Sequence, residues 1–179
     1  NIVTPFALSF TTTQTDVNCN LGNNGTITVN ATGGSGTLQY SKDGGNNYLF
    51  SNIFSGLTAG TYNVVVKDAN GCQTSPTPVI ITEPLALSLS TSQTTADCYG
   101  GSNATATAIV SGGTVPFTYL WNTSPQQSTS TASNLTPGNY SVSVTDNKGC
   151  SLTASVTIIS SMPDIPICLV TVDSTSTKN

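Results

Sequence analysis

Apolar and polar residues alternate along most of this chain with a period of two. In the stretch 25–31, Ile27, Val29 and Ala31 alternate with threonine and asparagine, and residues 104–110 repeat the pattern in the same phase. Successive side chains of a β-strand point to opposite faces, so one face would lie in a core and the other in water. No stretch shows the 3.6-residue period of an amphipathic helix. The pattern therefore predicts an all-β chain with antiparallel sheets.

The spacing of the alternating segments indicates the kind of fold. Strands are predicted in the first half at Ala7–Thr12, Gly25–Ala31, Leu38–Ser41, Tyr48–Phe50, Gly60–Lys67 and Val79–Thr82. Clusters of turn residues separate them at 33–36, 43–47 and 68–71. Short strands at this spacing, present again in the second half, predict two tandem immunoglobulin-like antiparallel β-sandwiches.

A long internal repeat sets the domain organisation. The matching landmarks are Cys19 and Cys98, the glycine pairs 33–34 and 112–113, Tyr40 and Tyr119, and the runs 68–72 and 146–150. Residues 2–10 also echo residues 80–89, so Asn1–Thr4 are predicted to be the last strand of a preceding repeat. The predicted boundaries are 1–4 for that strand, 5–84 and 85–162 for the two sandwiches, and 163–179 for a linker and the first strand of a following domain.

The junction between the two predicted sandwiches is very short. Pro84 biases Glu83 toward an extended conformation, because the proline ring restricts the preceding residue. Two domains joined in this way have little freedom to reorient, and the sequence therefore predicts a stiff rod.

Composition excludes several classes of function. Only 7% of the 179 residues are charged, the net charge is −4, and neither arginine nor histidine is present. A chain without a basic patch lacks the electrostatic attraction that drives binding to nucleic acid or anionic lipid. No apolar run approaches the roughly 18–20 residues that span a bilayer, so membrane insertion is not expected. Without histidine, Ser–His–Asp and Cys–His catalysis are impossible, and we predict neither an enzyme nor a cofactor.

Five cysteines divide into two for each repeat plus Cys168. The simplest pairing is Cys19 with Cys72 and Cys98 with Cys150, because the strands before the two cysteines of a repeat are expected to run in one direction. Such a bridge would close a loop of about 54 residues and stabilise a sandwich by roughly 4 kcal/mol. The alternative is four buried thiols in a cytosolic protein. Turn residues beside the cysteines favour disulfides and an oxidising compartment.

Three aromatic residues form the first candidate site. Phe117, Tyr119 and Trp121 are spaced by two and share one face of a predicted strand. An outward face would make an aromatic platform for sugar rings, whereas an inward face would place them in the core. Lys42 stands in the first repeat where the second has Trp121.

Two aspartates in Asp-x-x-Gly-Cys hairpins form the second candidate site. Asp68 and Asp146 are expected to cap their own turns by accepting backbone N–H groups, and calcium ligation is the alternative. Residues 41–48 match the spelling of a sialidase-type Asp-box, but Asp43-Gly44 is explained more simply as a hairpin turn.

Together these segments resemble the SprB repeat family. The resemblance rests on Cys19, the alternating strand and glycine pair at 25–34, Tyr40, and the runs 57–62 and 64–72. It implies very long cell-surface adhesins and other secreted proteins of Bacteroidetes, many exported by type IX secretion and one acting in gliding motility. The second repeat departs from the pattern in a Ser/Gln-rich segment at 121–133. The family carries no catalytic residues over to this chain.

These inferences predict a structural stalk of an extracellular bacterial cell-surface protein, which presents functional elements away from the cell. Neighbouring repeats of the same polypeptide are the expected partners, with surface polysaccharide and the secretion or motility machinery as further candidates. One alternative is a carbohydrate-binding module centred on Trp121. Another is a filament or secretion subunit in which Ile2–Thr4 or Ile167–Val172 completes a sheet of a second chain.

Overall fold

The computed structural model describes residues 6–97 and 100–161, and every regular element in them is a β-strand. None of these residues belongs to a helix that is long and apolar enough to cross a membrane. The chain divides into two compact units. Unit 1 comprises Asn1–Ser88, Val110–Thr118 and Thr145–Leu152, and unit 2 comprises Leu89–Ile109, Tyr119–Val144 and Thr153–Asn179. The predicted domain boundaries at 84 and 162 stay predictions.

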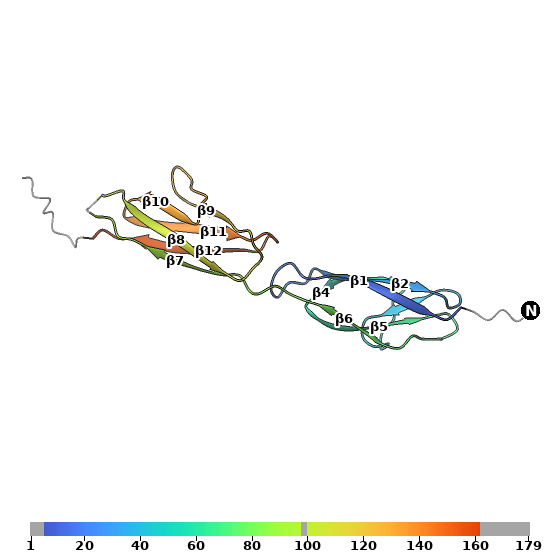
Figure 1. Cartoon of the computed structure of the whole chain (residues 1–179). Coiled ribbons are helices and arrows are strands. Elements are labelled where there is room, and N and C mark those ends of the chain that lie inside the picture. Colours follow the sequence, from blue (N-terminus) through green and yellow to red (C-terminus); the bar gives the residue numbers. More distant parts are fainter. Residues whose placement is uncertain (1–5, 98–99, 162–179) are drawn as a thin grey trace, which may run out of the picture. The chain divides into compact units, whose positions relative to one another are not determined.

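The first half of the chain forms two three-stranded antiparallel sheets (Figure 1). The strands are β1 (Ser9–Thr15), β2 (Gly25–Thr32), β3 (Gln39–Ser41), β4 (Ile53–Leu57), β5 (Gly60–Lys67) and β6 (Thr77–Ile81). One sheet has the order β1-β2-β4 and the other β3-β5-β6. Ile27 pairs with Phe54 in the first sheet, and Tyr62 pairs with Val79 in the second.

A single apolar core lies between these two sheets. Its fully or almost fully buried members are Val17, Ile27, Val29, Phe54, Leu57, Val64, Val66, Val79 and Ile81. Residues of β2 and β4 supply one side of this core, and residues of β5 and β6 supply the other. Ile27 and Val29, which the sequence places inward, are buried, whereas Ala31, also placed inward, is half-buried like Thr26 and Thr28. The arrangement is an antiparallel β-sandwich of immunoglobulin type, as the sequence predicts.

The second half of the chain repeats this topology. Its strands are β7 (Ser88–Gln93), β8 (Ala104–Ser111), β9 (Thr118–Trp121), β10 (Thr131–Leu135), β11 (Gly138–Thr145) and β12 (Ser151–Ile158). The sheet orders are β7-β8-β10 and β9-β11-β12, which match the first half strand for strand. The prediction of two tandem sandwiches is therefore confirmed.

The predicted strand Tyr48–Phe50 is wrong. Leu49 makes only an isolated bridge to Tyr40, and the fourth strand is instead Ile53–Leu57. The pairing of β4 with β2 contains a register shift, and Gly56 has a φ of 69° at that place. A bulge of this kind interrupts the period of two, so the buried residues of β4 are spaced by three and the alternation that marks a strand is lost.

Candidate functional site

The most distinctive feature of unit 1 is a disulfide that joins residues 131 positions apart. Cys19 is bonded to Cys150, with 5.8 Å between their Cα atoms, and the Cys150 sulfur lies 3.4 Å from the carbonyl oxygen of Asn18. Cys72 is a free, exposed thiol. The predicted pairing of Cys19 with Cys72 is wrong, and so is the pairing of Cys150 with Cys98. Cys98 itself, like Cys168, lies outside the described residues.

The reason is that Cys19 and Cys72 lie at opposite ends of the first sandwich. After β1 the chain runs beside the end of β6, where the Val17 N–H donates to the carbonyl oxygen of Thr82 (3.1 Å). Strand β5 begins at that end, because its first residue pairs with the last residue of β6. Cys72 follows the far end of β5, where its N–H donates to the Asp68 carboxylate (2.9 Å). Strands β1 and β5 run in opposite directions, contrary to the expectation from sequence.

The loop that carries Cys19 is held on the segment that follows β6. The Glu83 carboxylate accepts the N–H of Leu21 (2.7 Å), and the side-chain amide of Asn20 donates to the carbonyl oxygen of Pro84 (3.2 Å). These two contacts fix the Cys19 loop against the residues that lead into the second repeat. The segment itself is therefore tied to the sandwich that precedes it.

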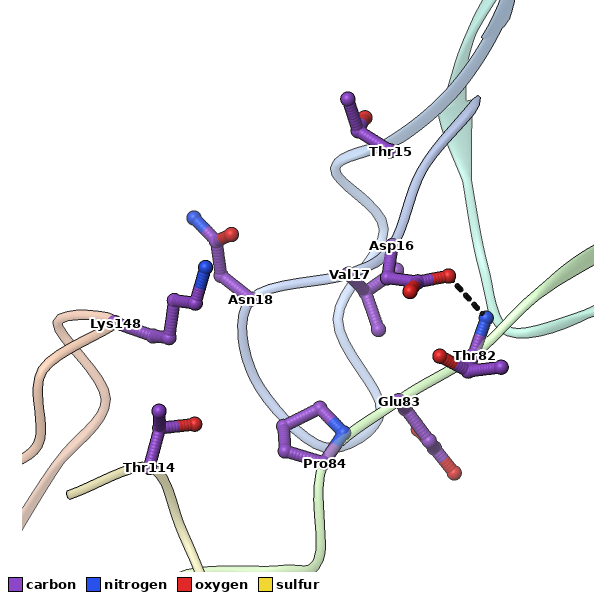
Figure 2. Close-up of a pocket in the computed structure, with 9 residues that line it drawn as sticks. All are labelled: Thr15, Asp16, Val17, Asn18, Thr82, Glu83, Pro84, Thr114 and Lys148. Carbon is purple, nitrogen blue, oxygen red and sulfur yellow. Dashed lines mark hydrogen bonds between the residues drawn. The ribbon is translucent and has the colours of Figure 1, made fainter. Parts of the chain in front are cut away.

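A charged contact reinforces the same place. The Asp16 carboxylate accepts the backbone N–H of Thr82 at 2.7 Å, the dashed line in Figure 2. The pKa of Asp16 is lowered, first by this N–H and then by the side chain of Thr82, and the positive charge of Lys148 acts in the same direction. The ionised form of Asp16 thus favours the arrangement of the loop.

A pocket of about 520 Å³ lies beside these contacts in unit 1 (Figure 2). It is lined by Thr15, Asp16, Val17, Asn18, Thr82, Glu83, Pro84, Thr114 and Lys148. Most of these side chains are polar and exposed, and Val17 is the one buried member of the lining. Small-molecule sites are enclosed and mostly apolar. This pocket is instead an open groove beside the disulfide.

Asp146 organises the hairpin that carries Cys150. One carboxylate oxygen accepts the N–H groups of Lys148 and Cys150, both at 2.9 Å, and the other accepts the N–H of Thr114 at 2.9 Å. Burial acts to raise the pKa of Asp146, but the backbone N–H groups of Cys150 and Thr114 outweigh it and the pKa is lowered. Asp68 accepts three backbone N–H groups in the same pattern. These contacts account for both aspartates as turn caps.

The calcium alternative for these aspartates has no support from neighbouring ligands. Within residues 6–97 and 100–161, no group of three His, Cys, Asp or Glu side chains converges in a way that could hold a metal ion. The oxygens of Asp68 and Asp146 already accept N–H donors, so a cation would have to displace structural hydrogen bonds.

The Asp-box spelling corresponds to a closed hairpin turn. The Ser41 hydroxyl donates to the Asp43 carboxylate (2.6 Å), which also accepts the N–H groups of Asn46 (3.1 Å) and Asn47 (2.9 Å). The pKa of Asp43 is well below its usual range, chiefly because of the Ser41 side chain and the Asn47 side chain and N–H. The carboxylate serves the local turn, as the simpler interpretation of the sequence has it.

We expect the unfolding midpoint in guanidinium chloride to be steady from pH 7 to 5 and to fall below about pH 4. The pKa values of Asp16, Asp43 and Asp146 are lowered in the folded state relative to the ordinary value of about 3.9. Their stabilisation is complete above that value and is lost as pH falls toward the folded pKa values. Asp146→Asn should make this acid dependence shallower. An unchanged midpoint between pH 4 and pH 2 would contradict the assignment.

Comparison with known proteins identifies the repeated module. The SprB repeat family model matches residues 11–47 and 90–126. Two segments of the chain, one in each half, match the SprB repeat. The predicted family resemblance is therefore confirmed at the corresponding places of both halves, and no curated protein sequence matches the chain.

Several solved structures show a distant similarity to the chain. The three N-terminal domains of the Highly Immunogenic Outer Capsid protein of bacteriophage RB49 are 20% identical, with a TM-score of 0.48, over 86% of this chain and 59% of that chain. A C-terminal fragment of intimin, in complex with the intimin-binding domain of its translocated receptor, is 12% identical, with a TM-score of 0.43, over 84% and 64%. The fibronectin(III)-like modules of Clostridium thermocellum CbhA are 17% identical, with a TM-score of 0.34, over 86% and 94%.

Trp121 lies in the core of the second SprB repeat. Its side chain is 0% exposed, and its indole Nε1 donates to the carbonyl oxygen of Thr129 at 3.0 Å. Tyr119 and Phe117, on the same face of the chain, are half-buried. A sugar ring cannot stack on an enclosed indole, so the proposed glycan platform at Trp121 is wrong and the core alternative is correct.

Smaller core side chains elsewhere in the second SprB repeat explain why Trp121 lies in the core. Ile27, Val29 and Phe54 of the first repeat correspond to Ala106, Ala108 and Ala132 of the second, and all six are buried. Three large side chains are thus replaced by methyl groups, whereas Lys42 is replaced by Trp121. Since protein cores are packed closely, a large inward side chain has to fill the space. The three alanines were the sequence signal for a core tryptophan.

The segments proposed for strand exchange, Ile2–Thr4 and Ile167–Val172, lie outside the described residues. Pairing of either segment with a sheet of a second chain stays a prediction.

Proposed function

We propose that the two SprB repeats are spacer modules of a secreted bacterial cell-surface protein of adhesin type, and that they hold functional elements away from the cell. The observation that carries the proposal is the Cys19–Cys150 disulfide, which links a loop of the first repeat to a hairpin of the second. A pulling force applied along the chain would pass through this bond. The segment between the two cysteines, which are 131 positions apart, would then be shielded from extension.

The character of the side chains supports the same proposal. Solubility with only 7% charged residues depends on hydroxyl and amide groups, which limits nonspecific ionic contacts. The disulfide supports an oxidising compartment outside the cytoplasm. The carboxylates of Asp43, Asp68 and Asp146 stabilise turns. We therefore propose a mechanical rather than an enzymatic role for the repeats. Export by type IX secretion and a part in gliding motility are further proposals, suggested by the family.

Stretching single molecules from their two ends tests the spacer proposal. With the disulfide intact, we expect complete unfolding to lengthen the chain only by the residues outside 19–150. Cys150→Ser should add roughly 430–470 Å of contour length, because a residue spans about 3.3–3.6 Å when extended. Cys72→Ser is the matched control and should behave like the unsubstituted chain. Equal contour lengths in the Cys150→Ser and unsubstituted chains would show that the disulfide does not shield the residues between Cys19 and Cys150 from extension.

A glycan array and a panel of bacterial polysaccharides test the binding alternative. Because Trp121 is enclosed, we expect no saturable binding by the oxidised chain. A lectin of known specificity serves as the positive control for the array. Saturable binding to any glycan would overturn a pure spacer role and would direct attention to exposed side chains instead of Trp121.

A further inference from the structure

Cys72 is an exposed free thiol in a tightly built hairpin, at the position that closes the turn against Asp68. The Asp68 carboxylate accepts the N–H groups of Asn70 (3.0 Å) and Cys72 (2.9 Å), and the Asp68 N–H donates to the carbonyl oxygen of Cys72 (3.0 Å). Gly71 has a φ of 86°, which permits the tight turn. The hairpin therefore presents the cysteine in a defined position.

The second repeat builds the same hairpin around a cysteine that is already bonded. The Asp146 N–H donates to the carbonyl oxygen of Cys150 (2.9 Å), and the Cys150 N–H donates to the Asp146 carboxylate (2.9 Å). Gly149 has a φ of 87°. In this setting Cys150 is disulfide-bonded to Cys19. Cys72 thus occupies the position whose equivalent in the second repeat holds a disulfide.

The surroundings of the two cysteines are equivalent as well. The Gly34 N–H donates to the carbonyl oxygen of Phe6 (3.0 Å), and the Gly113 N–H donates to that of Leu85 (2.9 Å). In each repeat the entering chain is therefore held by the glycine pair next to the cysteine hairpin.

The sequence that enters the first repeat also matches the sequence that enters the second. Residues 2–10 echo residues 80–89, with Pro5 at the place of Pro84, whose carbonyl oxygen accepts the side-chain amide of Asn20, and with no counterpart of Glu83. The start of the first repeat therefore repeats the proline and the following residues of the junction, but not the Glu83 contact to the Cys19 loop.

We propose that Cys72 forms a disulfide with the Cys19-equivalent cysteine of a preceding SprB repeat in the same polypeptide. Each junction of the array then carries one such bond, from the first cysteine of one repeat to the second cysteine of the next. This inference deepens the proposed spacer function, on which it rests, together with the prediction from sequence that a further repeat precedes these two. A tandem array linked in this way transmits force from repeat to repeat through covalent bonds.

The bond requires a two-electron oxidant, and a small-molecule disulfide such as oxidised glutathione is sufficient. The Cys72 thiolate attacks one glutathione sulfur, forms a mixed disulfide and releases one reduced glutathione. The thiolate of the preceding repeat then attacks the Cys72 sulfur of the mixed disulfide and releases the second glutathione. Two protein thiols and one oxidised glutathione thus give one protein disulfide and two reduced glutathiones.

An extended chain tests the proposal. Residues 1–83 are placed directly before residues 5–179, so that a further copy of the repeat precedes Cys72. A protease site is inserted between Ser75 and Pro76 of the added copy, where the loop is exposed, and the added copy carries Cys72→Ser. After refolding with oxidised and reduced glutathione, the chain is cleaved and run on a denaturing gel without reductant.

We expect the added fragment to stay attached completely without reductant and to be released by reductant. Cys72→Ser in the original copy should release it in both conditions. Two results would overturn the proposal. One is release of the fragment without reductant from the chain whose original copy keeps Cys72. The other is retention of the fragment in the chain whose original copy carries Cys72→Ser. Peptide mapping of the same samples must show the Cys19–Cys150 linkage, and its absence would remove the precedent and overturn the proposal as well. Neither result depends on the glycan screen, so failure here leaves the spacer function open to its own tests.

Discussion

Replacement of Trp121 by alanine is expected to lower the free energy of unfolding of the second SprB repeat by about 3–5 kcal/mol, the usual cost of truncating a large buried aromatic side chain. The indole is 0% exposed, and the substitution also leaves the carbonyl oxygen of Thr129 without its Nε1 donor. Ala106 and Ala132 are too small to fill the resulting cavity. The loss should therefore lie toward the upper end of that range.

Circular dichroism in guanidinium chloride measures this loss, since the substitution removes the chain's one tryptophan as a fluorescent probe. Leu120→Ala is the matched control, because Leu120 is the adjacent residue of β9 and is 50% exposed. We expect the control to cost less than about 1 kcal/mol, since truncation of half-exposed side chains removes little buried area. Equal losses in Trp121→Ala and Leu120→Ala would show that the indole does not fill the core.

Removal of the disulfide by Cys150→Ser should cost roughly 5 kcal/mol of unfolding free energy, since the bond closes a loop of about 130 residues in the unfolded chain. A loop of this length has many conformations that the bond excludes. The effect should exceed the roughly 4 kcal/mol expected for a bridge within one repeat, where the loop is shorter.

Chemical unfolding under oxidising conditions, repeated with reductant, measures the contribution of the bond. Cys72→Ser is the control, because Cys72 is exposed and free, and we expect a change within about 0.5 kcal/mol. Reductant should bring the unsubstituted chain to the stability of Cys150→Ser and leave that variant unchanged. A Cys72→Ser chain as unstable as Cys150→Ser would instead favour the pairing of Cys19 with Cys72.

Much of the fold follows from local pattern. The alternation in β2 and β5 predicts these strands within one residue of their observed ends, because successive side chains of a strand point to opposite faces of the sheet. The hairpins at Asp68 and Asp146 also follow locally, since an aspartate two to four residues before the accepted N–H groups can cap its own turn. Strand β4 does not follow, because the bulge at Gly56 erases the alternation.

The sequence by itself determined the repeat, the strands with regular alternation, the turn caps and the family. Only the tertiary structure decided the partner of Cys19 and the orientation of Trp121. A disulfide depends on which ends of the strands meet, and the local pattern is the same whether β1 and β5 run parallel or opposite. Burial of Trp121 depends on volume lost at Ala106, Ala108 and Ala132, which belong to the other sheet and come opposite β9 only when the two sheets pack face to face.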